Sequence, residues 1–440
     1  MVLLKNFINI FFVPELRKKV LVTLGILIVY RIGYHIPVIG VDIDKLKHFM
    51  DQASGASGIL GYIDLMSGGA MRQATLFALG IMPYITSSII MQMLTMTMPT
   101  LEQLIKEGEY GRKIINQYTR YLTFGVSLMQ SFGFALWVES MGLAITPGWA
   151  FRLLFMLSLT VGSMLVMWLG EQISFFGIGN GSSMIIFAGI VARFPADFLK
   201  VWSLDFLSWE MAIVVTLLFV FFAAFIVFLE KGERKIPVQY SRRIVGHRVY
   251  GGQSTYIPFK INTAGVMPVI FSSAILNIPM GIAALLSSRF EFFKNMTEWF
   301  SMTGVLFNVV DFLLIILFTF AYTAMIMDPE ELAENIKKSG GFIPGIRPGR
   351  KTAEFFNYIL TRIGLIGALY LGLLAVLPNI LWGVVNLPFY VSFLGGGSGT
   401  SLLIVVSVAL ETAAQIESYL IEHRYEGFLT SGRLKMRGAR

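Results

Sequence analysis

The sequence lacks cysteine altogether and is poor in histidine. With no cysteine among 440 residues, disulfide bonds and thiolate metal sites are excluded. The only histidines are His35, His48, His247 and His423, and their spacing matches no set of metal ligands. The H-E-x-x-H zinc signature, the G-x-S-x-G elbow and the Walker A loop are also missing. We therefore expect no enzyme and no metal or organic cofactor.

Charged residues are also scarce. Charged residues make up 14% of the chain and hydrophobic residues 55%. A soluble protein would carry about 25% charged residues, so most of this surface must face something other than water. Many apolar runs reach the roughly 20 residues that a helix needs to cross a bilayer. The composition predicts an all-α polytopic membrane protein.

The apolar runs predict about ten transmembrane helices. The fifth run is the weakest, because serine and glycine dilute it. The expected spans are 20–37, 73–98, 120–141, 151–170, 182–198, 210–229, 263–286, 305–327, 357–381 and 399–421.

Lysine and arginine predict the orientation of these spans. The N-terminus, the 99–117 loop, the 230–262 and 328–356 loops and the tail together hold 24 of the 35 basic residues. The opposite loops hold five with certainty. Because basic loops stay in the cytoplasm, both termini and both long loops are expected there, which requires an even number of spans.

Ten spans divide into two sets of five near residue 205. We expect an N-terminal half over 1–205, a C-terminal half over 206–422 and a basic cytoplasmic tail over 423–440. An odd number of spans in each half forces the second half to run inverted relative to the first. Inverted halves are common in transport proteins, where the functional path lies between them.

The two long loops call for an explanation beyond topology. Loops 230–262 and 328–356 are each about thirty residues, where compact proteins use short connections. Neither has the length or the apolar content expected of a domain. Their basic character predicts docking of something large from the cytoplasm, such as an acidic protein surface or RNA.

Ionisable groups are nearly missing from the centres of the spans. Glu411 is the main exception, and it is expected to face a water-filled funnel or a partner helix, or else to have a specific role. The glycine-rich GIGNG at 177–181 is interpreted as a flexible turn before a short span rather than as a phosphate site. An inverted-repeat transporter of a small solute stays open as an alternative, although it would be expected to bury more charge.

Several long stretches resemble the SecY family of protein-conducting channels, and the similarity runs nearly from end to end. They are SGGAMRQATLFALGIMPYITSSIIMQML (67–94), EGEYGRKIINQYTRY (107–121), WLGEQISFFGIGNGSSMIIFAGIVA (168–192), RVYGGQSTYIPFKINTAGVMPVIFSSAIL (248–276), KKSGGFIPGIRPGRKTAEFFNYILTRIGLIGALYL (337–371) and PFYVSFLGGGSGTSLLIVVSVALE (388–411).

The resemblance implies a clamshell of two inverted five-helix halves around an hourglass pore in the bacterial cytoplasmic membrane. Such a channel passes unfolded, signal-peptide-bearing polypeptides and releases hydrophobic segments sideways into membrane lipids. The implied partners are the small subunits SecE and SecG, the SecA ATPase and the ribosome. The energy would come from these partners, because the sequence has no nucleotide site.

The resemblance also implies three groups of site residues. The pore ring falls on Ile81, Ile85, Ile186, Ile270 and Ile404, while Ser182 departs from a sixth position that is often aliphatic. The lateral gate falls on Thr86, Gln130, Ser273 and Asn277. The contacts with SecA or the ribosome fall on Arg243, Arg248 and Arg347.

The stretch LGYIDLMSGG is apolar but too short to span a membrane. By resemblance, residues 59–70 form a plug that fills the outer funnel beneath the ring. The plug side chains are Ile63, Leu65 and Met66, and the hinge is Gly68 and Gly69, because glycine accepts backbone angles that other residues avoid.

Overall fold

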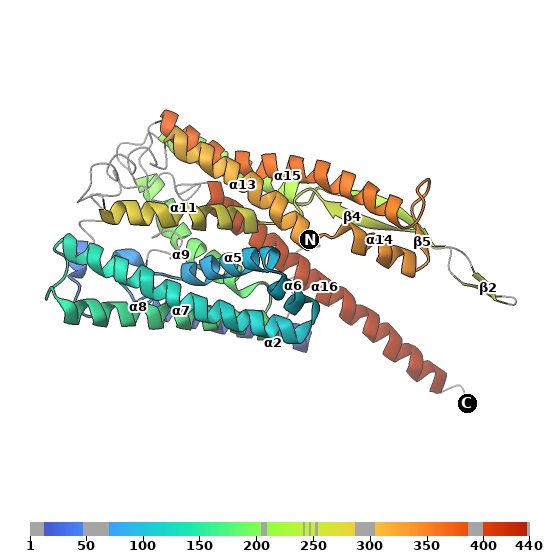
Figure 1. Cartoon of the computed structure of the whole chain (residues 1–440), viewed down its shortest axis with the longest axis horizontal. Helices are drawn as coiled ribbons and strands as arrows, with labels where there is room; N and C mark the ends of the chain where they lie inside the picture. Colours follow the sequence, from blue (N-terminus) through green and yellow to red (C-terminus); the bar gives the residue numbers. More distant parts are fainter. Residues whose placement is uncertain are drawn as a thin grey trace.

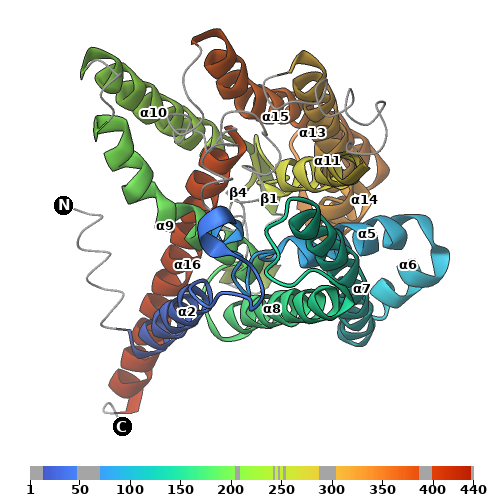
Figure 2. The same cartoon turned by 90° about the vertical axis from the view of Figure 1, so that its left-hand side faces the viewer.

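The computed structural model describes residues 13–46, 70–203, 209–240, 243–245, 248–250, 254–286, 304–385 and 399–437. Most of these residues are helical, and the helices run roughly along the long axis of the molecule (Figure 1). Seen along that axis, α2, α7 and α8 lie on one side and α11, α13 and α15 on the other (Figure 2).

Each of the ten expected spans overlaps a helix of the bundle. A short helix, α6 (Pro99–Lys106), connects the second and third. The ten helices are α2 (Pro14–Gly33), α5 (Met82–Thr97), α7 (Glu109–Ser140), α8 (Trp149–Phe176), α9 (Gly181–Ser203), α10 (Trp209–Glu230), α11 (Met267–Leu286), α13 (Val305–Ile326), α15 (Arg350–Val385) and α16 (Gly399–Arg437).

The surface of the bundle is apolar, as a membrane requires. Within the described residues, five stretches are long and apolar enough to cross a bilayer, in α7, α8, α13, α15 and α16. Shorter apolar stretches lie in α9, α10 and α11. Large side chains such as Ile28, Phe228 and Leu313 are more than half exposed, which would be costly in water over so wide an area. The chain is an all-α polytopic membrane protein.

The first part of the expected second span is not helical. Only α5 is an α-helix there, whereas residues 70–81 form a short 3₁₀ turn (η1, Met71–Gln73) and further turns. Ala74 and Gly80 take positive φ angles of 43° and 55°, and Pro83 favours a helix start because it lies in the first turn of α5. The prediction of one helix over 73–98 was therefore wrong in its first third.

Neither long loop was expected to form a domain by itself, but the structure joins the two into one folded unit. Strands β1 (Glu233–Tyr240) and β4 (Ser254–Lys260), from the first loop, pair antiparallel, and β5 (Gly341–Phe342), from the second, adds to β1. Together with α14 (Pro329–Lys338) and the start of α15 they form one unit, which we call the platform (Figure 1).

The platform has its own hydrophobic core. It includes Ile236 and Val238 of β1, Phe259 of β4 and Phe356 of α15, each at most 4% exposed. Neither loop is apolar enough alone, but the two loops and a helix end share one core. A small hairpin, β2 (Arg243–Val245) and β3 (Arg248–Tyr250), extends beyond the sheet (Figure 1).

Candidate functional site

The five predicted ring isoleucines converge on one buried cluster. Ile81 and Ile85 come from the start of α5, Ile186 from α9, Ile270 from α11 and Ile404 from α16. All five are between 1% and 6% exposed and belong to the same core cluster. Helices that are far apart in the sequence therefore bring aliphatic side chains together in the middle of the bundle.

Ile81 is held in place by the irregular segment before α5. Thr75 forms a bridge with Pro37, and its hydroxyl donates to the carbonyl of Ala70 at 3.3 Å. Gly162 in the middle of α8 lies against the carbonyl of Leu76, so close that an added Cβ would be 1.9 Å from that oxygen. Non-helical backbone at membrane depth is tolerated where protein surrounds it, as it does here.

Ser182 does not join this cluster. It is half-buried near the start of α9, and its hydroxyl donates to the Asn180 side chain at 2.7 Å. The adjacent Met184 and Ile185 are buried in the cluster beside Ile186. Buried aliphatic side chains on α9 therefore lie two and three residues beyond Ser182.

An apolar groove lies on the surface where the helices predicted to form the lateral gate meet. In Figure 2, α5 and α11 lie next to each other, and they are in contact. The groove runs between α5 on one side and α11 and α13 on the other. It is lined by Ile89, Gln92, Met93, Met96, Phe271, Phe318, Ala321, Tyr322 and Met325.

The predicted polar seam is not bridged by hydrogen bonds in the described part of the chain. Thr86 and Ser273 are buried and Gln130 is half-buried, but the Ser273 hydroxyl donates to the Val269 carbonyl of its own helix at 2.7 Å. The side chain of Asn277 lies outside the described residues. Across the seam, α5 and α7 thus meet α11 and α13 through packing alone, as far as the described residues extend.

Polar contacts are instead concentrated within each side of the seam. On one side, Arg120 of α7 forms a two-pronged ion pair with Glu171 of α8, with both N···O distances at 2.8 Å. Arg152 of α8 pairs with Glu139 of α7 at 2.5 Å. These two pairs fasten α7 to α8 near both ends, so these helices form one body.

On the other side, Asp311 of α13 is an intramembrane carboxyl that sequence reasoning missed. It is 4% exposed, and its Oδ1 accepts a hydrogen bond from Ser272 of α11 at 2.5 Å. The signal was available, since one aspartate interrupts the apolar run FNVVDFLLIIL. Glu411, which the sequence singled out, is exposed.

The GIGNG turn is anchored rather than flexible. The Ile178 N–H donates to the Thr23 hydroxyl of α2 at 3.0 Å, and the Gly179 N–H donates to Gln415 Oε1 of α16 at 2.9 Å. Gly179 takes a φ of +86°, which glycine adopts easily. The turn before α9 is therefore hydrogen-bonded both to α2, near the start of the chain, and to α16, near its end.

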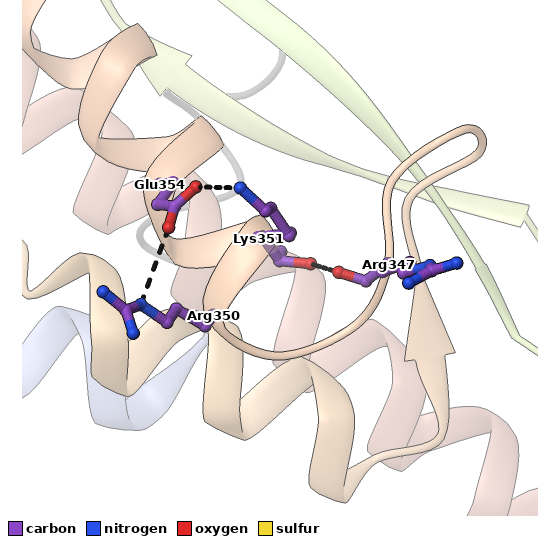
Figure 3. Close-up of polar contacts among 5 residues, drawn as sticks. Arg347, Arg350, Lys351 and Glu354 are labelled. Atoms are coloured by element: carbon purple, nitrogen blue, oxygen red, sulfur yellow. Dashed lines mark hydrogen bonds and ion pairs between the residues drawn. The ribbon is translucent and has the colours of Figure 1, made fainter.

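On the platform, Arg347 has no ionic partner among the residues that the structure describes. Its side chain is exposed and forms no ion pair within the described part of the chain, while its carbonyl accepts from the Thr352 hydroxyl at 3.0 Å. Arg350 and Lys351 both pair with Glu354, and the Arg347 guanidinium points away from them (Figure 3).

Among the other basic groups on the platform, Lys235 and Lys338 are paired, whereas Arg234, Lys260 and Lys337 are exposed and form no ion pair among the described residues. Glu233 accepts a hydrogen bond from Lys235, which raises the pKa of Lys235. Arg243 and Arg248 lie in the β2–β3 hairpin, but nothing is described of their side chains. Nearly all of the predicted plug, with Ile63, Leu65, Met66, Gly68 and Gly69, lies outside the described residues.

Comparison with known proteins gives independent evidence on the family of this chain. The SecY family model matches residues 75–413. The Protein translocase subunit SecY of Thermus thermophilus is 45% identical over 99% of this chain and 100% of that protein. The subunit of the same name from Thermotoga maritima is 40% identical over 98% of this chain and 99% of that protein.

Solved structures agree at the level of the fold. A structure described as "The structure of a protein conducting channel" has a TM-score of 0.63 at 18% identity, covering 91% of this chain and 92% of that one. A Sec61 channel from a canine ribosome–channel complex has a TM-score of 0.58 at 18% identity over the same shares. With two fifths or more of its residues shared with these subunits over nearly its whole length, the chain belongs to the SecY family.

Proposed function

We propose that this chain is the channel subunit of a protein translocase and a conduit rather than an enzyme. It passes unfolded, signal-peptide-bearing polypeptides across the bacterial cytoplasmic membrane and releases hydrophobic segments into lipid. Family membership supports this function, whereas a small-solute transporter has no support among the relatives.

The observation that carries the proposal is the buried cluster of isoleucines from α5, α9, α11 and α16. Aliphatic groups offer ions no ligands, and a narrow apolar neck can exclude water. The same groups let any peptide slide past without preference for its side chains. Ile81, Ile85, Ile186, Ile270 and Ile404 form the pore ring of this proposal, and the plug over 59–70 closes the funnel beneath it.

The proposed lateral gate is the seam between α5 and α7 on one side and α11 and α13 on the other. A signal peptide that enters the groove replaces helix–helix packing with its own, and so favours the open arrangement through its contacts. The two halves, 1–205 and 206–422, stay joined away from this seam. There, the Gly179–Gln415 bond and a 2.8 Å bond from Lys19 to the Tyr419 hydroxyl link them.

The platform is the proposed docking surface for SecA or the ribosome. Arg347 is suited to this role because it is exposed and free of ion pairs within the described residues. Arg243 and Arg248 on the protruding hairpin would add to it. This assignment places the platform, both termini and the tail in the cytoplasm, and SecE and SecG complete the complex.

Protected transport of a precursor tests this function. Vesicles containing this chain and SecE are supplied with SecA, ATP and a signal-bearing precursor, and protease-resistant precursor is measured. We expect protection that requires ATP and the signal sequence. Saturable uptake of a small solute without precursor protection would refute the channel and favour a transporter.

The gate assignment has a test of its own. The variant Met93→Cys/Met325→Cys places one thiol on each side of the groove, and the chain has no other cysteine. Joining the two thiols with a bifunctional reagent should block precursor transport, while each single-cysteine variant treated alike should remain active. Full transport through the joined channel would exclude opening at this seam.

A further inference from the structure

The buried carboxyl of Asp311 is hydrogen-bonded to α11, one of the proposed gate helices, and its place within a membrane span needs an explanation. An ionisable residue within a membrane span is costly, and its presence marks a functional position by default. Asp311 lies in α13, and its Oδ1 accepts from Ser272 Oγ of α11 at 2.5 Å. Ser272 is fully buried, and its hydroxyl also lies 3.3 Å from the Asp311 carbonyl oxygen. The contact ties α13 to a single point of α11.

That point lies opposite the functional face of α11. At 3.6 residues per turn, Ser272 is about 200° around the helix from Ile270, whereas Ser273 is only about 60° from it. Ile270 belongs to the ring cluster, and Ser273 lies on the same side of the helix. Measured the shorter way around, Ser272 is about 160° from Ile270, so its bond holds α11 from the side away from the ring.

Aromatic packing alone would not fix the rotation of α11 about its own axis. Phe271 meets Phe318 and Tyr322 of α13 edge-on, with ring centroids 6.1 Å and 5.7 Å apart. These contacts hold α11 against α13, but edge-to-face rings tolerate a range of geometries. A short hydrogen bond is more directional and weakens steeply as its angle departs from linear. The Ser272–Asp311 bond is therefore the element of this interface that defines a rotation.

We propose that Asp311 is a positioning residue, which sets the rotation of α11 so that Ile270 faces the pore ring. The proposal rests on the proposed channel function, because the ring and the seam are defined there. It adds that the closed channel is secured by a contact between α11 and α13, on one side of the gate and outside the pore ring. When the bond is lost, α11 turns, Ile270 leaves the ring and the resting seal weakens.

The test uses two variants that break the bond and one that keeps it. Asp311→Leu removes the acceptor and Ser272→Ala removes the donor, whereas Asp311→Asn retains a side-chain oxygen that can accept. Thr319→Val is the matched control, because it also removes a buried hydroxyl from α13, but one that donates to Ile315 of its own helix. Each is compared as the complete complex with SecE in vesicles and in planar bilayers.

Two measurements separate positioning from loss of stability. One is ion conductance of the resting channel. The other is the ratio of precursor protected with and without its signal sequence. Loss of one hydrogen bond should shift the closed–open equilibrium roughly three- to tenfold. We expect conductance to rise and the signal ratio to fall by that factor in Asp311→Leu and Ser272→Ala. Asp311→Asn and Thr319→Val should match the wild type.

A reciprocal exchange sharpens the test. The variant Ser272→Asp/Asp311→Ser places the carboxyl on α11 and the hydroxyl on α13, and it should recover the wild-type conductance and signal ratio. Recovery would attribute the effect to the bond, because the same two side chains are then paired with their places on the helices exchanged.

Several results would overturn the proposal. Conductance and signal ratio in Asp311→Leu and Ser272→Ala equal to those of Thr319→Val would do so. An effect of Asp311→Asn as large as that of Asp311→Leu would assign the role to charge and not to the bond. If Asp311→Leu fails to assemble, Ser272→Ala decides. Failure of the channel function itself is distinguishable, because the wild type would then protect no precursor.

Discussion

A methyl group added at Gly162 should disturb the proposed pore ring from a distance. Gly162 lies in the middle of α8, against the carbonyl of Leu76 in the irregular segment that leads to Ile81. In Gly162→Ala, the new Cβ would be 1.9 Å from that oxygen, whereas ordinary contact begins at 3.4 Å. The backbone at Leu76 must therefore retreat by about 1.5 Å. It cannot yield by a rotamer change, because the opposing atom belongs to the backbone.

The size of the effect follows from two opposing terms. Overpacking a core costs about 1–3 kcal/mol, and alanine in place of glycine within a helix contributes about 1 kcal/mol in favour. The control Gly125→Ala, in the middle of α7, gains the same helix term, and an added Cβ there meets nothing within 4 Å. The two variants should therefore differ by about 1–3 kcal/mol in stability. Only Gly162→Ala should also move Ile81.

Two assays check this reasoning. Thermal unfolding of each purified variant with SecE in detergent should give a lower midpoint for Gly162→Ala than for Gly125→Ala. Single-channel recording should show a higher resting conductance for Gly162→Ala alone. If both variants unfold at the same temperature and conduct equally at rest, the contact between α8 and the segment before α5 does not position the ring.

Three other substitutions test the remaining parts of the site. Ile85→Gly should raise resting ion conductance by widening the ring, and an unchanged conductance would remove Ile85 from it. Arg347→Glu should lower SecA-driven precursor transport roughly tenfold while Arg350→Glu changes it little, since Arg350 pairs with Glu354 whereas Arg347 has no partner carboxylate among the described residues; equal effects would argue against a specific contact. Gln415→Ala leaves the Gly179 N–H without its acceptor, so the free energy of unfolding should fall by about 1–3 kcal/mol and the unfolding temperature should fall with it. An unchanged unfolding temperature would mean that the bond is not maintained in the membrane.

Hydropathy was sufficient to predict the helices but not how they begin. All ten apolar runs overlap helices, because a bilayer leaves the backbone few alternatives. The run from 73 to 98 failed at its start because residues 70–81 are enclosed by protein, where irregular backbone is permitted. Pro83 and the positive φ of Gly80 are local signs of that break, but their apolar neighbours concealed them.

The platform was missed for a different reason. Its strands β1 and β5 come from two different loops and are about a hundred residues apart in the sequence. Neither β1 nor its other partner, β4, is apolar throughout. Pro237 and Pro258 argue against strands in a local reading. Pro237 is tolerated because β5 pairs with β1 only at Gln239 and Tyr240, so β1 has no neighbour from β5 at the proline. Only the shared core makes the arrangement stable.

The distribution of polar contacts within the described residues bears on how such a channel can open sideways without falling apart. Ion pairs fasten α7 to α8, and a buried hydrogen bond fastens α11 to α13. The groove between these bodies is lined mainly by apolar side chains, including Met93 and Met325. In a membrane no hydrophobic force holds apolar helices together, because lipid solvates them equally well. Opening the seam to lipid therefore costs little more than lost packing, whereas separating α7 from α8 would also break two ion pairs. Separation is thus easiest along the seam, where a hydrophobic segment leaving the pore would meet lipid.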